Sequence, residues 1–435
     1  MSGPKKIGLI TCIAVVAGNM MGSGIALLPA SLAKIGSVAI WGWIIAAIGA
    51  LSLAYVFARL ATNNPQTGGP IAYAGEVAPI FGHQTSILYY HANWIGNLAI
   101  AITAVAYLSV FFPVLNNPVP AAITSIAMVW LFTFVNLLGG AWVSRLTSIG
   151  LVLVLIPVVG TALFGWGSFD IEVYRQNWMA QPDGNVHRAV INSVLLCLWA
   201  FVGVESAAVS SDLVHNPSRT VPLATLGNCT CRNSLYCGLP SYCRHVSERS
   251  RGKFRSTFCF KCIQNCRGLG GSICIGIYGY CMSDISGLRM MLVGQAGRRA
   301  AMDGNFPAVF GETDNNGVPK KGLLIASTMM SILMVLLTIL SASGSNAADL
   351  FTQLTSIAVL LTMFPYFYSA IDLIRFESAT SKSILSLIAS AFAMLFCFAA
   401  LAGAEHYEIT ATIIISLLIF AFYARKLGGI QHKNI

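Results

Sequence analysis

One acidic side chain, Glu205, lies deep inside a long apolar stretch and directly follows Val202-Gly203-Val204. A carboxylate at bilayer depth is costly and is by default functional, because it can bind a cation or carry a proton. A structural salt bridge is the alternative, but the neighbouring apolar stretches contain no Lys or Arg to complete one. We therefore predict that Glu205 is a protonatable counter-charge for a cationic ligand.

A second apolar stretch contains the small residues Gly22, Ser23 and Gly24. A helix is broken inside a membrane only where its freed backbone groups line a cavity or a ligand. The N–H groups of Gly22 to Gly24, with the Ser23 hydroxyl, could bind a carboxylate. Glycine packing between helices is the alternative. Two such breaks in corresponding halves of the chain indicate a transporter site, and the presence of Glu205 beside the other break favours it.

The composition, 56% hydrophobic and only 10% charged over 435 residues, predicts an all-α polytopic membrane protein. The first apolar run follows a short basic N-terminal segment and is long enough to span a membrane, so no cleaved signal peptide is expected. Apolar windows of about 20 residues fall near 7–31, 38–60, 83–112, 119–138, 147–167, 189–211, 321–341, 350–374, 382–403 and 405–424.

The basic residues between these windows test the topology. Strict alternation of the spans places most of them on one side, so the positive-inside rule predicts that both termini are cytoplasmic. The loop 167–188 then lies on the opposite face. Because the loops at Arg219 and Arg298 are both internal, an even number of crossings must separate them. We expect twelve spans, two of them in that interval.

That interval contains a stretch, 228–289, of different composition. It holds nine of the twelve cysteines and nine basic residues against two acidic ones. A span over 243–262 would bury six basic side chains, at roughly 3 kcal/mol for each charge at a helix centre. This stretch should therefore not cross a membrane as written.

Three explanations compete for the stretch 228–289. A zinc or redox module would need recurrent ligand spacing, but Cys259-x-x-Cys262 has no matched partner pair. A basic cytoplasmic loop that binds anionic lipid would break the crossing parity unless no span lies here. Translation out of frame accounts best for the abrupt edges after Gly227 and before Met290.

The remaining sequence resembles the basic amino acid/polyamine antiporters of the amino acid-polyamine-organocation superfamily, and within it the exchangers of lysine for cadaverine. The match covers 1 to about 227 and 290 to about 426. The motifs that carry it are GNMMGSGIALLPA (18–30), GGPIAYAGE (68–76), YYHANWIGN (89–97), LWAFVGVESAAVS (198–210), HNPSRTVPLA (215–224), GQAGRRAAMDGNFP (294–307) and PYFYSAIDLIRFE (365–377).

The resemblance implies one transporter domain, 1–435, with an inverted five-plus-five helix fold and discontinuous helices one and six. The first repeat would cover about 7–167 and the second about 189–374, disrupted at 228–289, with two extra helices at about 382–424. In the family, a Trp lies over the substrate at the place where this chain has Arg289. Arg289 would put a cation into the site of a cationic substrate.

A lysine-like substrate needs donors for its carboxylate, a sleeve for its methylenes and an acceptor or π-face for its distal ammonium. Trp199, Phe201, Tyr89 and Tyr90 could supply the sleeve, although membrane aromatics more often face lipid or the interface. Asn97 could bind a polar group in the cavity, and a role in joining helices is the alternative.

Coupling and gating residues follow from the same comparison. Glu76 and Asp303 lie near predicted helix ends, where water can reach them, so the argument made for Glu205 is weaker there. The tyrosines that fit gate or cavity positions by resemblance, and that sequence alone would place at the membrane interface, are Tyr73, Tyr366, Tyr368 and Tyr423.

Together these features predict a secondary antiporter of the bacterial inner membrane that exchanges lysine for cadaverine and is linked to acid resistance. No enzyme motif, ATP-binding run or matched metal spacing is present, so no cofactor, metal or nucleic acid is expected. The expected partners are the two substrates and the lipid bilayer, and the protein could form a homodimer. The rival functions are proton-coupled uptake of a polyamine or basic amino acid, and a substrate sensor without transport.

The out-of-frame explanation can be tested by re-sequencing the DNA that covers codons 226–290 and translating all three frames. We expect a neighbouring frame to encode two apolar spans with few cysteines and a Trp in place of Arg289. A confirmed present frame would contradict it. The chain as written lacks two spans that close the cavity, so we expect it to insert poorly or transport weakly.

Overall fold

The computed structural model describes residues 8–20, 28, 31–64, 68–109, 111–139, 171–179, 184–209, 211, 214–227, 289–314, 317–340, 347–380 and 383–431. Within these ranges the regular structure is helical and contains no β-strand. Six helices in the same ranges are long and apolar enough to cross a membrane. The prediction of an all-α polytopic membrane protein is confirmed.

Each predicted window that the structure describes contains an α-helix. The α-helices are α1 (Leu9–Met20), α3 (Ile40–Asn63), α4 (Pro70–Val77), α5 (Pro79–Leu108), α6 (Pro118–Leu137), α8 (Ile171–Gln176), α9 (Val186–Trp199), α10 (Ser206–Val209), α11 (Pro217–Gly227), α15 (Lys320–Leu340), α16 (Ala347–Thr380), α17 (Ile384–Ala402) and α18 (His406–Gln431). Short 3-10 helices are η1 (Ser37–Ala39), η2 (Pro113–Asn116) and η5 (Ala308–Phe310). Residues 289–302 are helical as well.

Several predicted spans fall outside this description in whole or in part. The window 147–167 and the anomalous stretch up to residue 288 lie outside the described residues. The count of twelve spans and the division into two inverted repeats with two extra helices therefore stay predictions.

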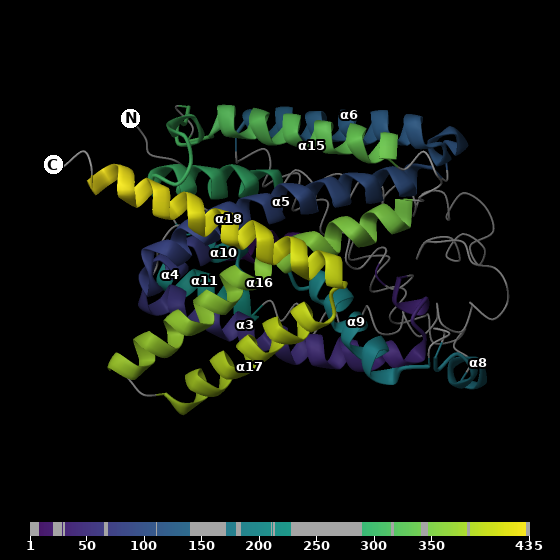
Figure 1. Cartoon of the computed structure of the whole chain (residues 1–435), viewed down its shortest axis with the longest axis horizontal. Coiled ribbons are helices and arrows are strands. Elements are labelled where there is room, and N and C mark those ends of the chain that lie inside the picture. The colour runs from purple at the N-terminus through teal and green to yellow at the C-terminus, as the bar shows by residue number, and fades with distance from the viewer. Residues whose placement is uncertain are drawn as a thin grey trace.

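The helices form a bundle in which α5 and α16 pack against each other near the middle. α6 and α15 run side by side along one edge, and α3, α9 and α17 gather at the opposite edge (Figure 1). The most apolar windows of α16 and α3 are 72% and 61% buried, against 28% and 22% for α6 and α18. α16 and α3 are therefore mostly enclosed by neighbouring helices, and α6 and α18 present their apolar side chains outward, as lipid-facing helices do.

Contacts between distant segments agree with the predicted alternation of spans. The backbone N–H groups of Ser37 and Val38 donate to the carbonyls of Asn177 and Trp178, at 2.9 and 3.1 Å. The start of the second predicted span thus lies on the same side as the loop 167–188, as alternation requires. The orientation of that side relative to the cytoplasm stays a prediction.

An ion pair joins α3 and α16. Arg59 on α3 donates to the Glu377 carboxylate on α16 at 2.8 Å. The Glu377 side chain is fully buried, and Arg59 is 35% exposed. Arg59→Gln leaves a buried carboxylate without its counter-charge, so we expect the free energy of unfolding to fall by about 2 kcal/mol.

Thermal unfolding in detergent measures this loss. Lys321→Gln is the matched control, because the Lys321–Glu312 pair is more than half exposed and should contribute little. Equal losses of melting temperature in the two variants would contradict the assignment.

Candidate functional site

The predicted break at Val202 to Ser206 is present in the structure. α9 ends at Trp199, residues 200–205 form turns, and α10 begins at Ser206. Gly203 has φ of +115°, which L side chains rarely adopt. A Cβ at Gly203 would lie 2.9 Å from the Cβ of Asn19 on α1, so the turn also needs a glycine for close approach. The corresponding break at Gly22, Ser23 and Gly24 lies outside the described residues.

The Glu205 carboxylate lies within this break and is 1% exposed. The Tyr89 hydroxyl of α5 donates to Oε1 at 2.7 Å, and the Tyr366 hydroxyl of α16 donates to Oε2 at 2.5 Å. The backbone N–H of Gly203 also donates to Oε2, at 3.1 Å. Three donors compensate the loss of water around a buried charge. Tyr366, which the sequence suggested as a gate residue, is thus a direct partner of Glu205.

A cation also lies at this site, because the Arg289 guanidinium sits 4.6 Å above the centre of the Trp199 ring. Its Nη2 donates to the carbonyls of Asn19 at 3.3 Å and Val202 at 3.2 Å. Arg289 is 3% exposed and interacts electrostatically with Glu205. The geometry agrees with the implication that Arg289 places a cation in the predicted site. The π-face that was expected to receive a substrate ammonium is covered by this side chain.

Two of the predicted sleeve aromatics contact other aromatic rings. Phe201 lies edge-on to Trp43 of α3, with ring centroids 6.2 Å apart. Tyr90 lies edge-on to Phe306 and Phe310, at 5.0 and 5.7 Å. Among the predicted aromatics, Tyr89 donates to Glu205 and Trp199 contacts Arg289, whereas the ring contacts of Phe201, within the break, and of Tyr90 are with other aromatic side chains.

Asn97 lies two helical turns beyond Tyr89 on α5 and is buried. Its Nδ2 donates to the sulfur atoms of Met290 at 3.7 Å and Met330 at 3.9 Å. These contacts join α5 to α15 and to the helix 289–302. The alternative role, in which Asn97 joins helices, is therefore the one that these contacts favour.

Three predicted coupling residues meet at a second place. Glu76 of α4, Asp303 and Tyr423 of α18 line one cavity of about 310 Å³. Asp303 accepts from Arg299 Nε at 2.9 Å, and Arg299 lines the same cavity. Tyr368 lies elsewhere: its hydroxyl donates to Gln84 Oε1 at 2.6 Å, and its ring stacks on Phe81.

A row of aromatic rings leads from the buried carboxylate to α4, a helix that lines this cavity. Tyr366 packs edge-on against Phe57 of α3 at 5.4 Å, and Phe57 lies 6.4 Å from Tyr73 of α4. Tyr73 is fully buried, and the same short helix lines the cavity with Glu76. Sequence analysis missed Phe57, because a phenylalanine in an apolar span carries no distinguishing signal.

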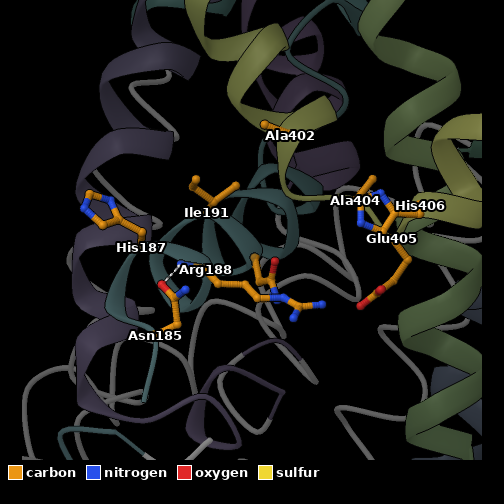
Figure 2. Close-up of a pocket in the computed structure, with 9 residues that line it drawn as sticks. Asn185, His187, Arg188, Ile191, Ala402, Ala404, Glu405 and His406 are labelled. Atoms are coloured by element: carbon orange, nitrogen blue, oxygen red, sulfur yellow. Dashed lines mark hydrogen bonds between the residues drawn. The ribbon is translucent and has the colours of Figure 1, made fainter. Parts of the chain in front are cut away.

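A further cavity, of about 350 Å³, lies between the start of α9 and the turn that joins α17 to α18. In Figure 2, Arg188 reaches from α9 toward the side that carries Glu405 and His406. These three residues are exposed, and Trp199 lies at the other end of α9. The sequence did not predict this hollow. Among the described residues, no group of three or more His, Cys, Asp or Glu side chains could hold a metal ion.

The helical bundle, the broken helix and its buried carboxylate define a polytopic membrane transporter. Residues 7–227 match the model of the family described as amino acid permease. The chain belongs to this family, which is one of transporters rather than enzymes. The family match ends at residue 227, where the composition of the chain changes.

Three relatives extend this comparison. The cadaverine/lysine antiporter of Escherichia coli (strain K12) is 58% identical over 436 residues, covering 100% of this chain and 98% of the relative. The putrescine transporter PotE of Haemophilus influenzae is 30% identical over 375 residues, covering 84% and 83%. The putrescine transporter PotE of Escherichia coli (strain K12) is 27% identical over 437 residues, covering 99% and 98%.

Gly203→Ala tests the break. We expect the free energy of unfolding to fall by about 2 to 4 kcal/mol, because the variant adds backbone strain and a clash with Asn19. Gly139→Ala is the matched control, since Gly139 has φ of +110° but open space around it. We expect it to cost about 1 kcal/mol, from strain alone. Equal melting temperatures for the two variants in detergent would show that contact with α1 does not hold the break.

Proposed function

We propose that the protein is a secondary antiporter that exchanges lysine for cadaverine across the bacterial inner membrane, with both termini in the cytoplasm and a role in acid resistance. The observation that carries this proposal is the Glu205 carboxylate, buried in a helix break and held by Tyr89 and Tyr366. The 58% identity to a protein named cadaverine/lysine antiporter, over the whole chain, supports this choice of substrates.

The charges of the two substrates fit such a site. Lysine and cadaverine share a distal ammonium group on an apolar chain, and Glu205 provides its counter-charge. Without the substrate, the Tyr89 and Tyr366 hydroxyls hold the Glu205 carboxylate by hydrogen bonds, and the Arg289 guanidinium interacts with it electrostatically. The lysine carboxylate is assigned to the break at Gly22, Ser23 and Gly24. Cadaverine has no carboxylate, so this contact serves only one of the two substrates.

Alternating access needs a path from the substrate to a gate. A substrate or a proton at Glu205 would change the hydrogen bond that the Tyr366 hydroxyl donates to this carboxylate. The Tyr366 ring packs on Phe57, and Phe57 packs on Tyr73. We assign this row as the link to α4, whose residue Glu76 lines the cavity with Asp303 and Tyr423. Opening of that cavity toward Glu205 would release the substrate to one side.

Proton-coupled uptake of putrescine is the second candidate, favoured by the relatives named putrescine transporter. A sensor without transport is the third. Counterflow in liposomes separates the three functions: exchange requires substrate inside, symport responds to a proton gradient, and a sensor moves nothing. The homodimer stays a prediction that this experiment does not address.

Glu205→Gln removes the counter-charge and keeps the shape of the side chain. We expect uptake of labelled cadaverine into lysine-loaded liposomes to fall by about ten- to a hundredfold, and the remaining activity to lose its pH dependence. Glu312→Gln is the control, because Glu312 forms an exposed ion pair. Normal exchange by Glu205→Gln at every pH tested would end the proposed role of this carboxylate.

A further inference from the structure

The hollow between the start of α9 and the turn that joins α17 to α18 lies at the ends of two candidate membrane spans. The span Ile384–Ala402 ends at this hollow, and the span His406–Ala424 begins at it. Because a span ends where the hydrocarbon layer ends, the hollow lies at the depth of the lipid head groups. A molecule bound there can contact water and the apolar layer at the same time.

Two side chains of opposite charge line this hollow from different elements. Arg188 comes from the first turn of α9, and Glu405 comes from the turn that precedes α18 (Figure 2). In the part of the chain that the structure describes, no ion pair joins the Arg188 guanidinium to the Glu405 carboxylate. A ligand with one negative and one positive group can therefore bind to both side chains.

The start of α9 has the chemistry of a phosphate site. Asn185 caps the helix by accepting from the Arg188 backbone N–H at 3.1 Å, and His187 lines the hollow beside it. The first N–H groups of a helix have no partner within the helix and carry the positive end of its dipole. An arginine guanidinium can bind two phosphate oxygens at once. The Glu405 carboxylate can only accept hydrogen bonds, so it suits an ammonium group.

An exposed apolar stripe on α17 leads into the hollow. Ala402 lines the hollow, and Phe398 and Leu395 lie about one and two helical turns before it on the same helix face. The Phe398 and Leu395 side chains are 56% and 63% exposed. On α18, Ile413 lies about two turns after His406 and is 51% exposed. Acyl chains below a head group in the hollow would contact these apolar side chains.

We propose that the hollow binds a phospholipid whose head group carries a phosphate and a primary ammonium group, as phosphatidylethanolamine does. Arg188 and the start of α9 bind the phosphate, Glu405 accepts from the ammonium group, and the acyl chains lie along the stripe of Leu395 and Phe398. A free amino acid also has both charges, but it would leave the stripe unused. This inference goes beyond the proposed function and does not depend on it.

Native mass spectrometry of the full-length chain in detergent tests the proposal. The chain is titrated with phosphatidylethanolamine, phosphatidylglycerol and phosphatidylcholine that have identical acyl chains. Phosphatidylglycerol has no ammonium group, and the methylated ammonium of phosphatidylcholine cannot donate a hydrogen bond. We expect phosphatidylethanolamine to bind about three- to fivefold more tightly than either, as for an ion pair that is partly exposed to water. Equal binding of the three lipids would overturn the proposal.

Variants of the two charged side chains assign the head-group contacts. Glu405→Gln should weaken binding of phosphatidylethanolamine alone and bring its affinity ratio to phosphatidylglycerol close to one. Arg188→Gln should weaken binding of both lipids, because both carry the phosphate. Glu172→Gln and Arg175→Gln are the matched controls, since this pair is exposed on α8 and does not line the hollow. An unchanged ratio in Glu405→Gln would show that the ammonium contact is wrong.

A variant of the stripe tests the acyl-chain contacts. Leu395→Ser should weaken binding of all three lipids by a similar factor and leave their ratios unchanged. Leu385→Ser is the matched control, because Leu385 is 61% exposed near the other end of α17. Circular dichroism and size-exclusion chromatography establish that the variants are folded.

Two soluble ligands test the other possible occupants of the hollow. If phosphoethanolamine binds as tightly as the lipid, the acyl chains contribute nothing and the lipid assignment is wrong. If Arg188→Gln and Glu405→Gln change the binding of lysine and not that of lipid, the hollow is a substrate site and the proposal is wrong. Exchange of lysine for cadaverine is measured separately by counterflow, so failure of the lipid proposal leaves the proposed function standing.

Discussion

The requirement that a buried carboxylate be hydrogen-bonded organises the centre of this molecule. Glu205 is almost completely removed from solvent, and no water at bilayer depth can replace a missing donor. Its three donors come from α5, α16 and the helix break itself. The Glu205 side chain therefore fixes how α5 and α16 approach the broken helix. Any change of charge on Glu205 alters its hydrogen bonds to all three segments.

The break depends on close backbone approach as much as on hydrogen bonding. Gly203 supplies a positive φ and leaves room for Asn19 of α1, so α1 touches the break at the residue where the chain turns. From Glu205 the row Tyr366, Phe57 and Tyr73 leads to the cavity beside α4. Rigid aromatic packing of this kind passes on a small displacement, because a close-packed interior has little free space to absorb it.

Arg289 gives the site a second charge of opposite sign. It stands at the edge of the stretch whose composition differs from the rest, and the family match ends at the other edge, at Gly227. The guanidinium is nevertheless accommodated by the Trp199 face and two backbone carbonyls. Charge balance with Glu205 makes this arrangement less costly than an isolated cation inside the bundle.

Sequence alone determined the membrane class and most helices and singled out Glu205 as a candidate, because apolar length, a glycine beside an acid and a charge at bilayer depth are local signals. Only the tertiary structure decided which tyrosines bind the carboxylate, since Tyr89 and Tyr366 are 116 and 161 residues away from it in sequence. It also decided that Phe201 contacts Trp43, that Tyr90 contacts Phe306 and Phe310, and that Arg289 covers Trp199. Which side chain of a helix faces a partner depends on the rotation and depth of the helix. Those are set by packing against neighbours, which composition and spacing within one span do not specify.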